Sequence, residues 1–238
     1  MKQMNKGKLY LIPSPLGDYD PAEVIPAGTL GVLRSLKTFV VEETRTARRY
    51  LSAAGLRGHI AELEFHELNE HTAAAETEAL LPLFDRGDVG LISEAGLPAV
   101  ADPGAALVAI CHRHGIAVVP LAGPSSLMLA LMASGLDGQS FAFRGYLPVE
   151  AAERRAALRR CEKDSSAMHQ TQIFIETPYR NDTLLKDMLE QLSPATRLCV
   201  AADITMPDAF ICTKTVSQWK KNTPLIGKRP CVFLILAR

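Results

Sequence analysis

The fold of this chain is decided by residues 89–120, VGLISEAGLPAVADPGAALVAICHRHGIAVVP. A short apolar run, Val89 to Ser93, leads into a loop rich in glycine and proline, and a helical pattern follows from Pro103 to His114. Gly115 then stands where helices commonly end, and a second β-rich run covers Ala117 to Pro120. A strand, a helix and a strand in this order predict a parallel pair joined by a crossover helix.

The same alternation runs through the first half of the chain. Short β-rich segments are followed each time by a loop and then by a helix or turn, which predicts a parallel, Rossmann-like sheet with helices on its faces. The further strands expected here are Leu9 to Ile12, Phe39 to Glu42 and His59 to Leu63. The further helices expected are Thr44 to Ala54, Thr72 to Phe84 and Pro124 to Ser134.

The pattern changes near Gly138, where we place a domain boundary. Phe210 to Thr215 follows the preceding strand without room for a crossover helix, so the sheet of the second half should be mixed. We therefore expect a two-lobed α/β protein with an N-terminal domain at 1–137 and a C-terminal domain at 138–238. The strands expected in the second domain are Phe141 to Tyr146, Gln172 to Glu176, Arg197 to Ala202, Phe210 to Thr215 and Cys231 to Leu236, with helices at Glu150 to Lys163 and Asn181 to Gln191.

Composition narrows the class of protein. With 238 residues, of which 47% are hydrophobic, the chain can bury one large core or two small ones. A formal net charge of zero argues against a protein that coats nucleic acid by bulk charge, although a local basic face stays possible. No apolar run reaches the roughly 18 residues of a membrane span. The five cysteines include no C-x-x-C pair, so we expect reduced thiols and a cytoplasmic protein.

The loops that leave the strands are the place to look for chemistry, because ligands bind outside the carboxyl ends of a parallel sheet. The loop from Ser93 to Gly104 suits close wrapping around a ligand, and it suits a stiff connection equally well. Neither G-x-G-x-x-G nor G-x-x-x-x-G-K-[ST] occurs, which disfavours a dinucleotide or triphosphate site and a nicotinamide dehydrogenase. The other four loops are Pro13 to Asp18, Glu43 to Arg45, His66 to His71 and Gly123 to Ser126.

Two motifs suggest functions for which a simpler structural explanation is favoured. His66 and His71 stand at i and i+5, about 140° apart around a helix, so they would not share a metal as an H-E-x-x-H pair does. We expect no metal site. A basic run in the helix expected from Glu150 favours a solvated face, and phosphate contacts together with the arginines near Glu43 stay possible. The basic residues are Arg154, Arg155, Arg159, Arg160 and Lys163, with Arg45, Arg48 and Arg49 near Glu43.

Several blocks, in order along the chain, resemble one family. The resemblance covers essentially the whole chain and is to the tetrapyrrole methylase superfamily, within it to the branch of small-subunit ribosomal RNA cytidine 2′-O-methyltransferases. The blocks are Leu9 to Gly17, Glu42 to Arg45, Leu91 to Pro98 with Ala101 to Gly104, Val118 to Ser126, Gly145 to Pro148, Phe174 to Arg180 and Cys231 to Leu236.

The resemblance implies a methyltransferase that uses S-adenosylmethionine (SAM), with the cofactor in a cleft between two α/β lobes and with a homodimeric assembly. It also implies RNA, or the ribosomal small subunit, as the partner. The implied cofactor residues are Leu16, Ala95, Gly96, Leu97, Val100, Ser125, Ser126, Glu176 and Ile204. We expect Glu43, Arg45 and Asn69 to face the methyl acceptor.

A hydroxyl acceptor would also need a base, and the sequence does not identify it. Glu43, Glu94, Asp102 and Glu176 are candidates at strand ends, while Glu43 could instead be a partner for Arg45. For Glu94 and Asp102 we favour roles in holding their loop. The ribosomal branch usually has an Arg-Glu-Leu-Thr-Lys run where this chain has Ala202 to Met206, so its lysine is missing here.

That departure leaves three functions to weigh. The leading prediction is an RNA methyltransferase that acts on ribosomal RNA. The second is a methyltransferase of a tetrapyrrole or another small molecule, which the zero net charge favours. The third is a catalytically silent RNA-binding or ribosome-assembly module that keeps the fold without the lysine.

Overall fold

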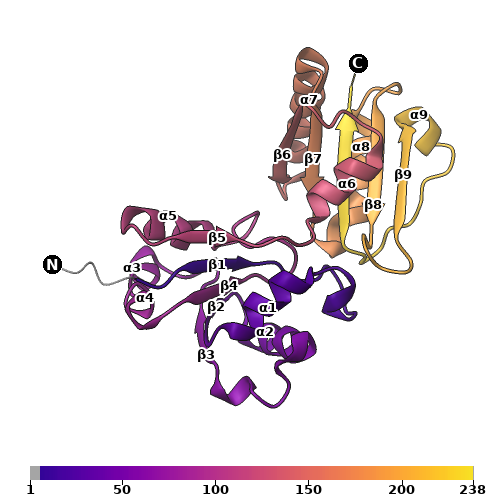
Figure 1. Ribbon diagram of the computed structural model, residues 1–238. Coiled ribbons are helices and arrows are strands. Elements are labelled where there is room, and N and C mark those ends of the chain that lie inside the picture. Colours follow the sequence, from indigo (N-terminus) through magenta and orange to yellow (C-terminus); the bar gives the residue numbers. More distant parts are fainter. Residues whose placement is uncertain (1–5, 238) are drawn as a thin grey trace. The chain divides into compact units, whose positions relative to one another are not determined.

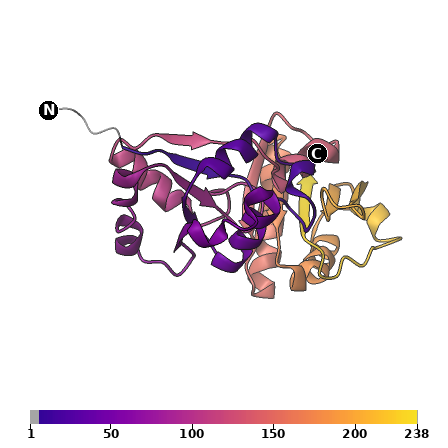
Figure 2. The same ribbon diagram turned by 60° about the horizontal axis from the view of Figure 1, so that its bottom comes forward.

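The computed structural model describes residues 6–237 and divides into two compact units, one up to Ser125 and one from Ser126 onward. The first unit contains a sheet of five parallel strands in the order β3-β2-β4-β1-β5. Figures 1 and 2 both show β1 beside β5, with their arrows pointing the same way. The strands are β1 (Leu9–Ile12), β2 (Thr38–Val41), β3 (Glu64–Glu67), β4 (Val89–Ile92) and β5 (Val118–Pro120).

Helices cover both faces of this sheet because neighbouring strand residues point to opposite faces. Phe39 lies in an apolar cluster with residues of α1 and α2, whereas Val40 lies in a second cluster with residues of α4 and α5. The helices are α1 (Ala27–Ser35), α2 (Thr44–Leu51), α3 (Ala74–Glu78), α4 (Leu83–Arg86) and α5 (Ala105–Arg113), with short turns η1 (Pro21–Glu23), η2 (Ser52–Leu56) and η3 (Ile60–Glu62). The predicted parallel α/β sheet is confirmed.

Three local predictions for this unit were wrong or incomplete. The strand expected at His59 to Leu63 is a 3₁₀ turn, and β3 begins after it as an edge strand with mostly polar residues. The helix expected at Thr72 to Phe84 is broken into α3 and α4, and Pro82, which has no backbone N–H, stands at the start of α4. Helix α1 was not predicted, since Gly28 and Gly31 lower its intrinsic helix propensity.

The second unit contains a mixed sheet in the order β6-β7-β10-β8-β9. Strands β6 and β7 are parallel, while β10 runs antiparallel to both β7 and β8, and β9 runs antiparallel to β8. All residues of the central strand β10 are buried, as its uninterrupted apolar run requires. The strands are β6 (Phe141–Tyr146), β7 (Thr171–Ile175), β8 (Arg197–Ala202), β9 (Phe210–Thr215) and β10 (Cys231–Leu236). The predicted mixed sheet is confirmed.

One face of the second sheet carries the large core and the other carries a single helix. The core contains side chains of α7 (Ala151–Met168), α8 (Asn181–Gln191) and α9 (Val216–Trp219), and η4 (Pro178–Arg180) precedes α8. Helix α6 (Ser126–Ser134) packs against β8, β9 and β10, and the Thr213 hydroxyl donates to the Ser134 carbonyl at 2.6 Å. For this reason the second unit begins at Ser126, ahead of the boundary expected near Gly138. No helix of residues 6–237 has the length and apolar composition needed to cross a membrane.

Much of the basic run in α7 serves helix packing. Arg154 and Asp187 of α8 are both buried, and the Arg154 Nε donates to the Asp187 carboxylate at 2.7 Å. The Arg155 Nε donates to its other oxygen at 2.8 Å. Burial by itself would raise the pKa of Asp187, but the hydrogen bonds from Arg155 and Arg154 outweigh it and hold the pKa below its usual value. Asp187 is therefore the anchor between α7 and α8.

Replacing Asp187 should lower the free energy of unfolding of the second unit. Asp187→Ala leaves the buried Arg154 guanidinium without a counter-charge, and we expect a loss of about 3–5 kcal/mol in the free energy of unfolding. The double variant Arg154→Met/Asp187→Leu removes both charges and should recover most of that loss. Urea denaturation followed by circular dichroism measures both. The control Lys186→Ala removes only an exposed ion pair with Glu190 at 3.9 Å, and a loss for Asp187→Ala as small as the control's would contradict the assignment.

Candidate functional site

Five loops meet at one edge of the first sheet. All of its strands are parallel, so the loops that follow β1, β2, β3, β4 and β5 leave from the same carboxyl edge, the place where open α/β sheets bind ligands. They correspond to the five loops that the sequence singled out, except that His66 and Glu67 of the third lie inside β3. The fold therefore confirms that they share one edge, and the hydrogen bonds among them show how the edge is built.

Two of these loops are joined by a pair of backbone hydrogen bonds. The Ser14 N–H donates to the Gly96 carbonyl at 2.8 Å, and the Gly96 N–H donates back to the Ser14 carbonyl at 3.1 Å. The Ser14 hydroxyl, which is buried, donates to the Ser93 carbonyl at 2.8 Å. Gly96 has a φ of 74°, a conformation that glycine adopts without strain. The loop after β1 and the loop after β4 are thus held as one layer.

The loop after β5 comes equally close to the loop after β1. A Cβ atom placed on Gly123 would lie 2.3 Å from the Cβ of Pro13, a distance that only glycine avoids. The Thr29 hydroxyl of α1 donates to the Ala122 carbonyl at 2.8 Å, and this hydrogen bond ties the loop to α1. Three loops from three neighbouring strands therefore form one continuous surface in the first unit.

Three of the cofactor residues implied for the first unit lie on this surface, and the others lie in the loops that form it. A Cβ on Gly96 would be 3.4 Å from the Leu16 side chain, so Leu16, Ala95 and Gly96 are brought together. Val100 lies further along the same loop, with 44% of its surface exposed. Its neighbours Ala99 and Ala101 have φ values of 66° and 63°, which is a strained backbone for alanine and is typical of functional loops. Leu97 follows Gly96, and Ser125 ends the loop after β5.

The residues implied for the second unit lie at one edge of its sheet. Glu176 directly follows β7 and Ile204 lies just after β8, and these two strands point the same way because both are antiparallel to β10. One oxygen of Glu176 accepts hydrogen bonds from the Thr177 N–H at 2.7 Å and from the Arg180 Nε at 2.9 Å. Its other oxygen is buried and has no partner. Ser126 is the first residue of α6.

Glu43, expected to face the acceptor, caps the N-terminus of α2. Its two carboxylate oxygens accept from the Arg45 N–H and the Thr46 N–H, each at 2.7 Å, and from the Thr46 hydroxyl at 2.6 Å. The Thr46 hydroxyl, followed by the two backbone N–H groups, lowers the pKa of Glu43. Of the two roles considered for Glu43, the structure thus shows a contact with Arg45 through its backbone, as a helix cap.

The other two residues expected to face the acceptor lie nearby. Arg45 is exposed in the first turn of α2. Asn69 lies beyond the end of β3, where its side-chain oxygen accepts from the His71 N–H at 3.0 Å. Strands β2 and β3 are adjacent, and the Thr44 hydroxyl donates to the Glu67 carboxylate at 2.7 Å across the gap between their ends. His66 lies within β3 and His71 in the turn that follows, so the two do not share a helix face.

A pocket of about 360 Å³ lies beside this surface, entirely within the first unit. Its walls come from the loop after β1, from one face of α2 and from the start of the loop after β4, and they include Leu16, Tyr19, Thr46, Arg49, Tyr50 and Glu94. From the sequence alone, Tyr19, Arg49 and Tyr50 were not expected to share one site. The helical spacing of Thr46, Arg49, Tyr50 and Ala53, which places them on one face of a helix, was the signal that could have done so.

Three carboxylates lie close together next to the pocket. The Glu94 N–H donates to the Glu42 carboxylate at 3.3 Å. Burial raises the pKa of Asp102 to about 6, and the negative charges of Glu42 and Glu94 add to this shift. Burial also raises the pKa of Glu42, with contributions from the charges of Glu94 and Glu70. At neutral pH this edge therefore holds negative charge that is costly to maintain.

The effect of the Asp102 charge on the free energy of unfolding can be measured as a function of pH. Because the pKa of Asp102 is about 6 in the folded chain and about 3.9 in an unfolded one, the folded state holds its proton more tightly, and the free energy of unfolding falls as the pH rises through this interval. We expect Asp102→Asn to stabilise the protein at pH 7.5 by about 1 kcal/mol, after allowance for solvent screening, and to have little effect at pH 4. Urea denaturation at both pH values tests this, with Asp85→Asn on the exposed surface of α4 as the matched control. An equal gain at the two pH values would contradict it.

Comparison with solved structures supports the two-unit architecture. Uroporphyrin-III C-methyltransferase from Thermus thermophilus, solved in complex with S-adenosylhomocysteine, is similar to this chain with a TM-score of 0.58 and 18% identity. The match covers 97% of each chain. At this identity the likeness shows a shared fold and no more.

Relatives of known name are more similar in sequence. The protein named "Ribosomal RNA small subunit methyltransferase I" of Vibrio cholerae serotype O1 is 33% identical over 83% of this chain, which spans 65% of the Vibrio protein, or about two thirds of its length. The protein of the same name in Pseudomonas aeruginosa is 33% identical over 98% of this chain and 79% of its own length. Residues 8–219 match the model of the family described as Tetrapyrrole (Corrin/Porphyrin) Methylases. The chain belongs to this tetrapyrrole methylase family.

Proposed function

We propose that this protein is a SAM-dependent methyltransferase that acts on the RNA of the small ribosomal subunit, at a ribose 2′-hydroxyl as its family branch implies. The observation that carries the proposal is the 33% identity, over 98% of this chain, to a protein named as a small-subunit ribosomal RNA methyltransferase. A ribosomal substrate also implies that the protein acts in the cytoplasm. Because the chain spans only about two thirds of the Vibrio relative, its activity is inferred and has to be tested.

The residues of the carboxyl edge fit the cofactor that we propose. SAM has adenosyl and methionine parts that need close walls and few charges, and Leu16, Ala95 and Gly96 provide an apolar, closely approached surface. We assign Leu97, Val100 and Ser125 to the same surface. In the second unit we assign Ser126, Glu176 and Ile204, and the buried oxygen of Glu176 that lacks a partner suits a hydroxyl or amino donor of the cofactor.

In this reaction the main task of the protein is to align the acceptor with the methyl group. SAM supplies a methyl group already activated on a sulfonium, so the site has to hold an acceptor oxygen in line with it. A ribose hydroxyl also has to lose a proton to a base. Glu43 is occupied as a helix cap and Glu176 by Arg180, which leaves Glu94 and Asp102, with Glu42 beside them, as the group that could accept it. The pKa of Asp102, at about 6, suits a base that works near neutral pH.

Met206, at the position of the missing lysine, lies in a tight turn between β8 and β9. Its N–H donates to the Asp203 carbonyl at 2.9 Å, and the Asp203 carboxylate pairs with Arg229 at 2.5 Å. This turn presents no lysine of its own, so it is the one feature that favours a silent RNA-binding or ribosome-assembly module as the second candidate function. Turnover on RNA separates the two candidates.

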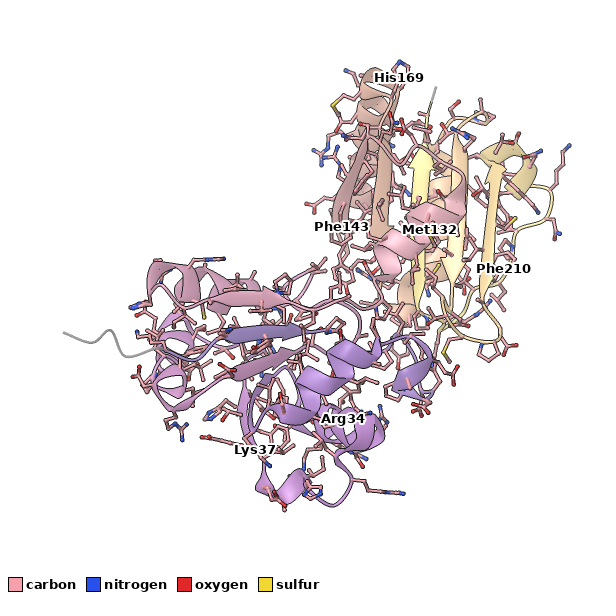
Figure 3. All side chains as sticks on the ribbon, in the orientation of Figure 1. Arg34, Lys37, Met132, Phe143, His169 and Phe210 are labelled. Carbon is pink, nitrogen blue, oxygen red and sulfur yellow. The ribbon has the colours of Figure 1, made fainter. Side chains whose placement is uncertain are left out.

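Arg45 and Asn69 remain our proposal for residues that face the RNA, together with the backbone of the α2 N-terminus that Glu43 caps. The homodimer also remains a proposal. It is supported by apolar side chains left exposed on the second unit, among them Met132 of α6 and Phe143 of the edge strand β6, with 77% and 36% of their surfaces exposed (Figure 3). Apolar side chains gathered on a surface often mark an interface between subunits.

Cofactor binding should depend on the backbone of Gly96. Gly96→Ala places a Cβ beside Leu16 at a φ of 74°, so we expect the Kd for SAM, measured by titration calorimetry, to rise at least tenfold. Gly115→Ala is the matched control, since its φ is 66° and its added Cβ would meet open space at the end of α5. Saturable SAM binding by wild type is required, and an equal effect of the two variants would remove Gly96 from the cofactor wall.

Methyl transfer to RNA should be visible on undermethylated small ribosomal subunits. We expect labelled methyl groups from SAM to appear in ribosomal RNA, and, after alkaline hydrolysis, in dinucleotides that resist cleavage because a methylated 2′-oxygen cannot attack the neighbouring phosphate. Label in mononucleotides would place the methyl group on a base. SAM binding without any labelled RNA would leave the cofactor assignment standing and favour the silent module or another acceptor.

A further inference from the structure

The pocket of about 360 Å³ in the first unit is lined mostly by residues other than those we assign to the cofactor. Only Leu16 and Ala95 of its lining belong to the residues we assign to the cofactor. The polar part of the wall combines two tyrosines, a guanidinium, hydroxyl groups and two carboxylates, contributed by Tyr19, Tyr50, Arg49, Ser14, Thr46, Asp18 and Glu94. A site of this size is in the range that holds a small ligand or one residue of a polymer.

Arg49 is the cation of this pocket, which it lines together with two acidic residues. The neighbouring Arg48 lies over the ring of Phe65 at 5.8 Å, on a different face of α2. Within residues 6–237, Arg49 forms no ion pair with a carboxylate, although it lines the same pocket as Asp18 and Glu94. An exposed guanidinium held on a helix at the rim of a pocket is well suited to a phosphate, which it binds through two parallel N–H groups.

Tyr19 supplies a flat wall whose position is held. Its hydroxyl oxygen accepts from the Leu16 N–H at 3.2 Å, so the ring is tied to the loop that carries Leu16. Tyr50, which lines the same pocket, is buried, and its hydroxyl donates to the Pro13 carbonyl at 2.8 Å. Rings fixed in this manner are the usual surface on which an unstacked nucleobase packs, because every base has a π face.

We propose that this pocket takes one unstacked nucleotide of the RNA substrate, with its base against Tyr19 and its phosphate on Arg49. The inference rests on the proposed function, since it names the part of the substrate that reaches the site. Glu94 and Thr46 offer acceptors and a hydroxyl to the ribose and to the exocyclic amine of a base such as cytosine. Leu16 and Ala95, shared with the cofactor surface, place the sugar of that nucleotide next to the proposed methyl donor.

The test uses two ligands that differ only in the phosphate. Binding of cytidine 5′-monophosphate and of cytidine is measured by titration calorimetry on the full chain, in the presence of saturating S-adenosylhomocysteine. We expect Arg49→Ala to weaken the monophosphate about tenfold and to leave cytidine and SAM unchanged, because one charge-assisted contact is lost. Arg113→Ala is the control: this arginine lies in the last turn of α5, away from the pocket, and its exposed pair with Glu78 contributes little.

A second variant tests the aromatic wall. Tyr19→Ala should weaken cytidine and its monophosphate alike, about tenfold each, while Tyr19→Phe keeps the ring, loses the hydrogen bond from the Leu16 N–H that holds it, and should lose less affinity than Tyr19→Ala. With RNA as ligand, Arg49→Ala should also reduce the slope of log affinity against log salt by about 1.

The outcomes that would overturn the proposal are distinct from those that would overturn the proposed function. Weaker SAM binding in Arg49→Ala would make the pocket part of the cofactor site. Equal affinity of wild type and Arg49→Ala for the monophosphate would rule out a nucleotide phosphate on Arg49. Absence of binding to wild type at millimolar concentration of the monophosphate would rule out the nucleotide site. If wild type bound the monophosphate through Arg49 but labelled no RNA, the pocket would stand and the proposed function would fall.

Discussion

The reciprocal backbone hydrogen bonds between Ser14 and Gly96 are the constraint on which the site of the first unit depends. They join the ends of two adjacent strands, β1 and β4, beyond the sheet itself. Backbone groups in loops often bond to water, but here two such bonds plus the buried Ser14 hydroxyl join the two loops into one surface. The glycine at position 96 is required because the second loop has to turn with a positive φ while its backbone lies against the first.

The same layer explains why charge accumulates there. Strands β2 and β4 are neighbours in the sheet, so Glu42 and Glu94, which follow them, are brought within reach of each other. Asp102 lies in the longer loop after β4, close enough to this pair that the charges of Glu42 and Glu94 raise its pKa. Groups that are costly at neutral pH are rarely kept for stability, and three carboxylates at the carboxyl edge of a parallel sheet fit the role in proton transfer or recognition that we propose.

The second unit is organised by buried polar pairs in place of a loop layer. Asp187 holds α7 to α8 through Arg154 and Arg155, and Glu176 holds η4 to the end of β7 through Arg180. The first pair is satisfied throughout, whereas the second leaves one carboxylate oxygen and one guanidinium nitrogen buried without partners. Because an unmade buried hydrogen bond costs about 1–3 kcal/mol, the second pair is the one that has reason to meet a ligand.

The sequence by itself determined the class of fold, because strands and helices leave their periods in the local order of apolar residues. It predicted the bounds of β1, β6, β8, β9, β10 and α8, the parallel and mixed sheets, and the loops that share the carboxyl edge of the first sheet. It did not predict α1, whose glycines hide its propensity, or the position of the edge strand β3, which is half polar. Only the tertiary structure decided which polar side chains are already occupied. Glu43 caps a helix, Arg154 is buried on Asp187, and Arg49 is left facing a pocket with Tyr19, since each depends on a partner or neighbour brought close by folding alone.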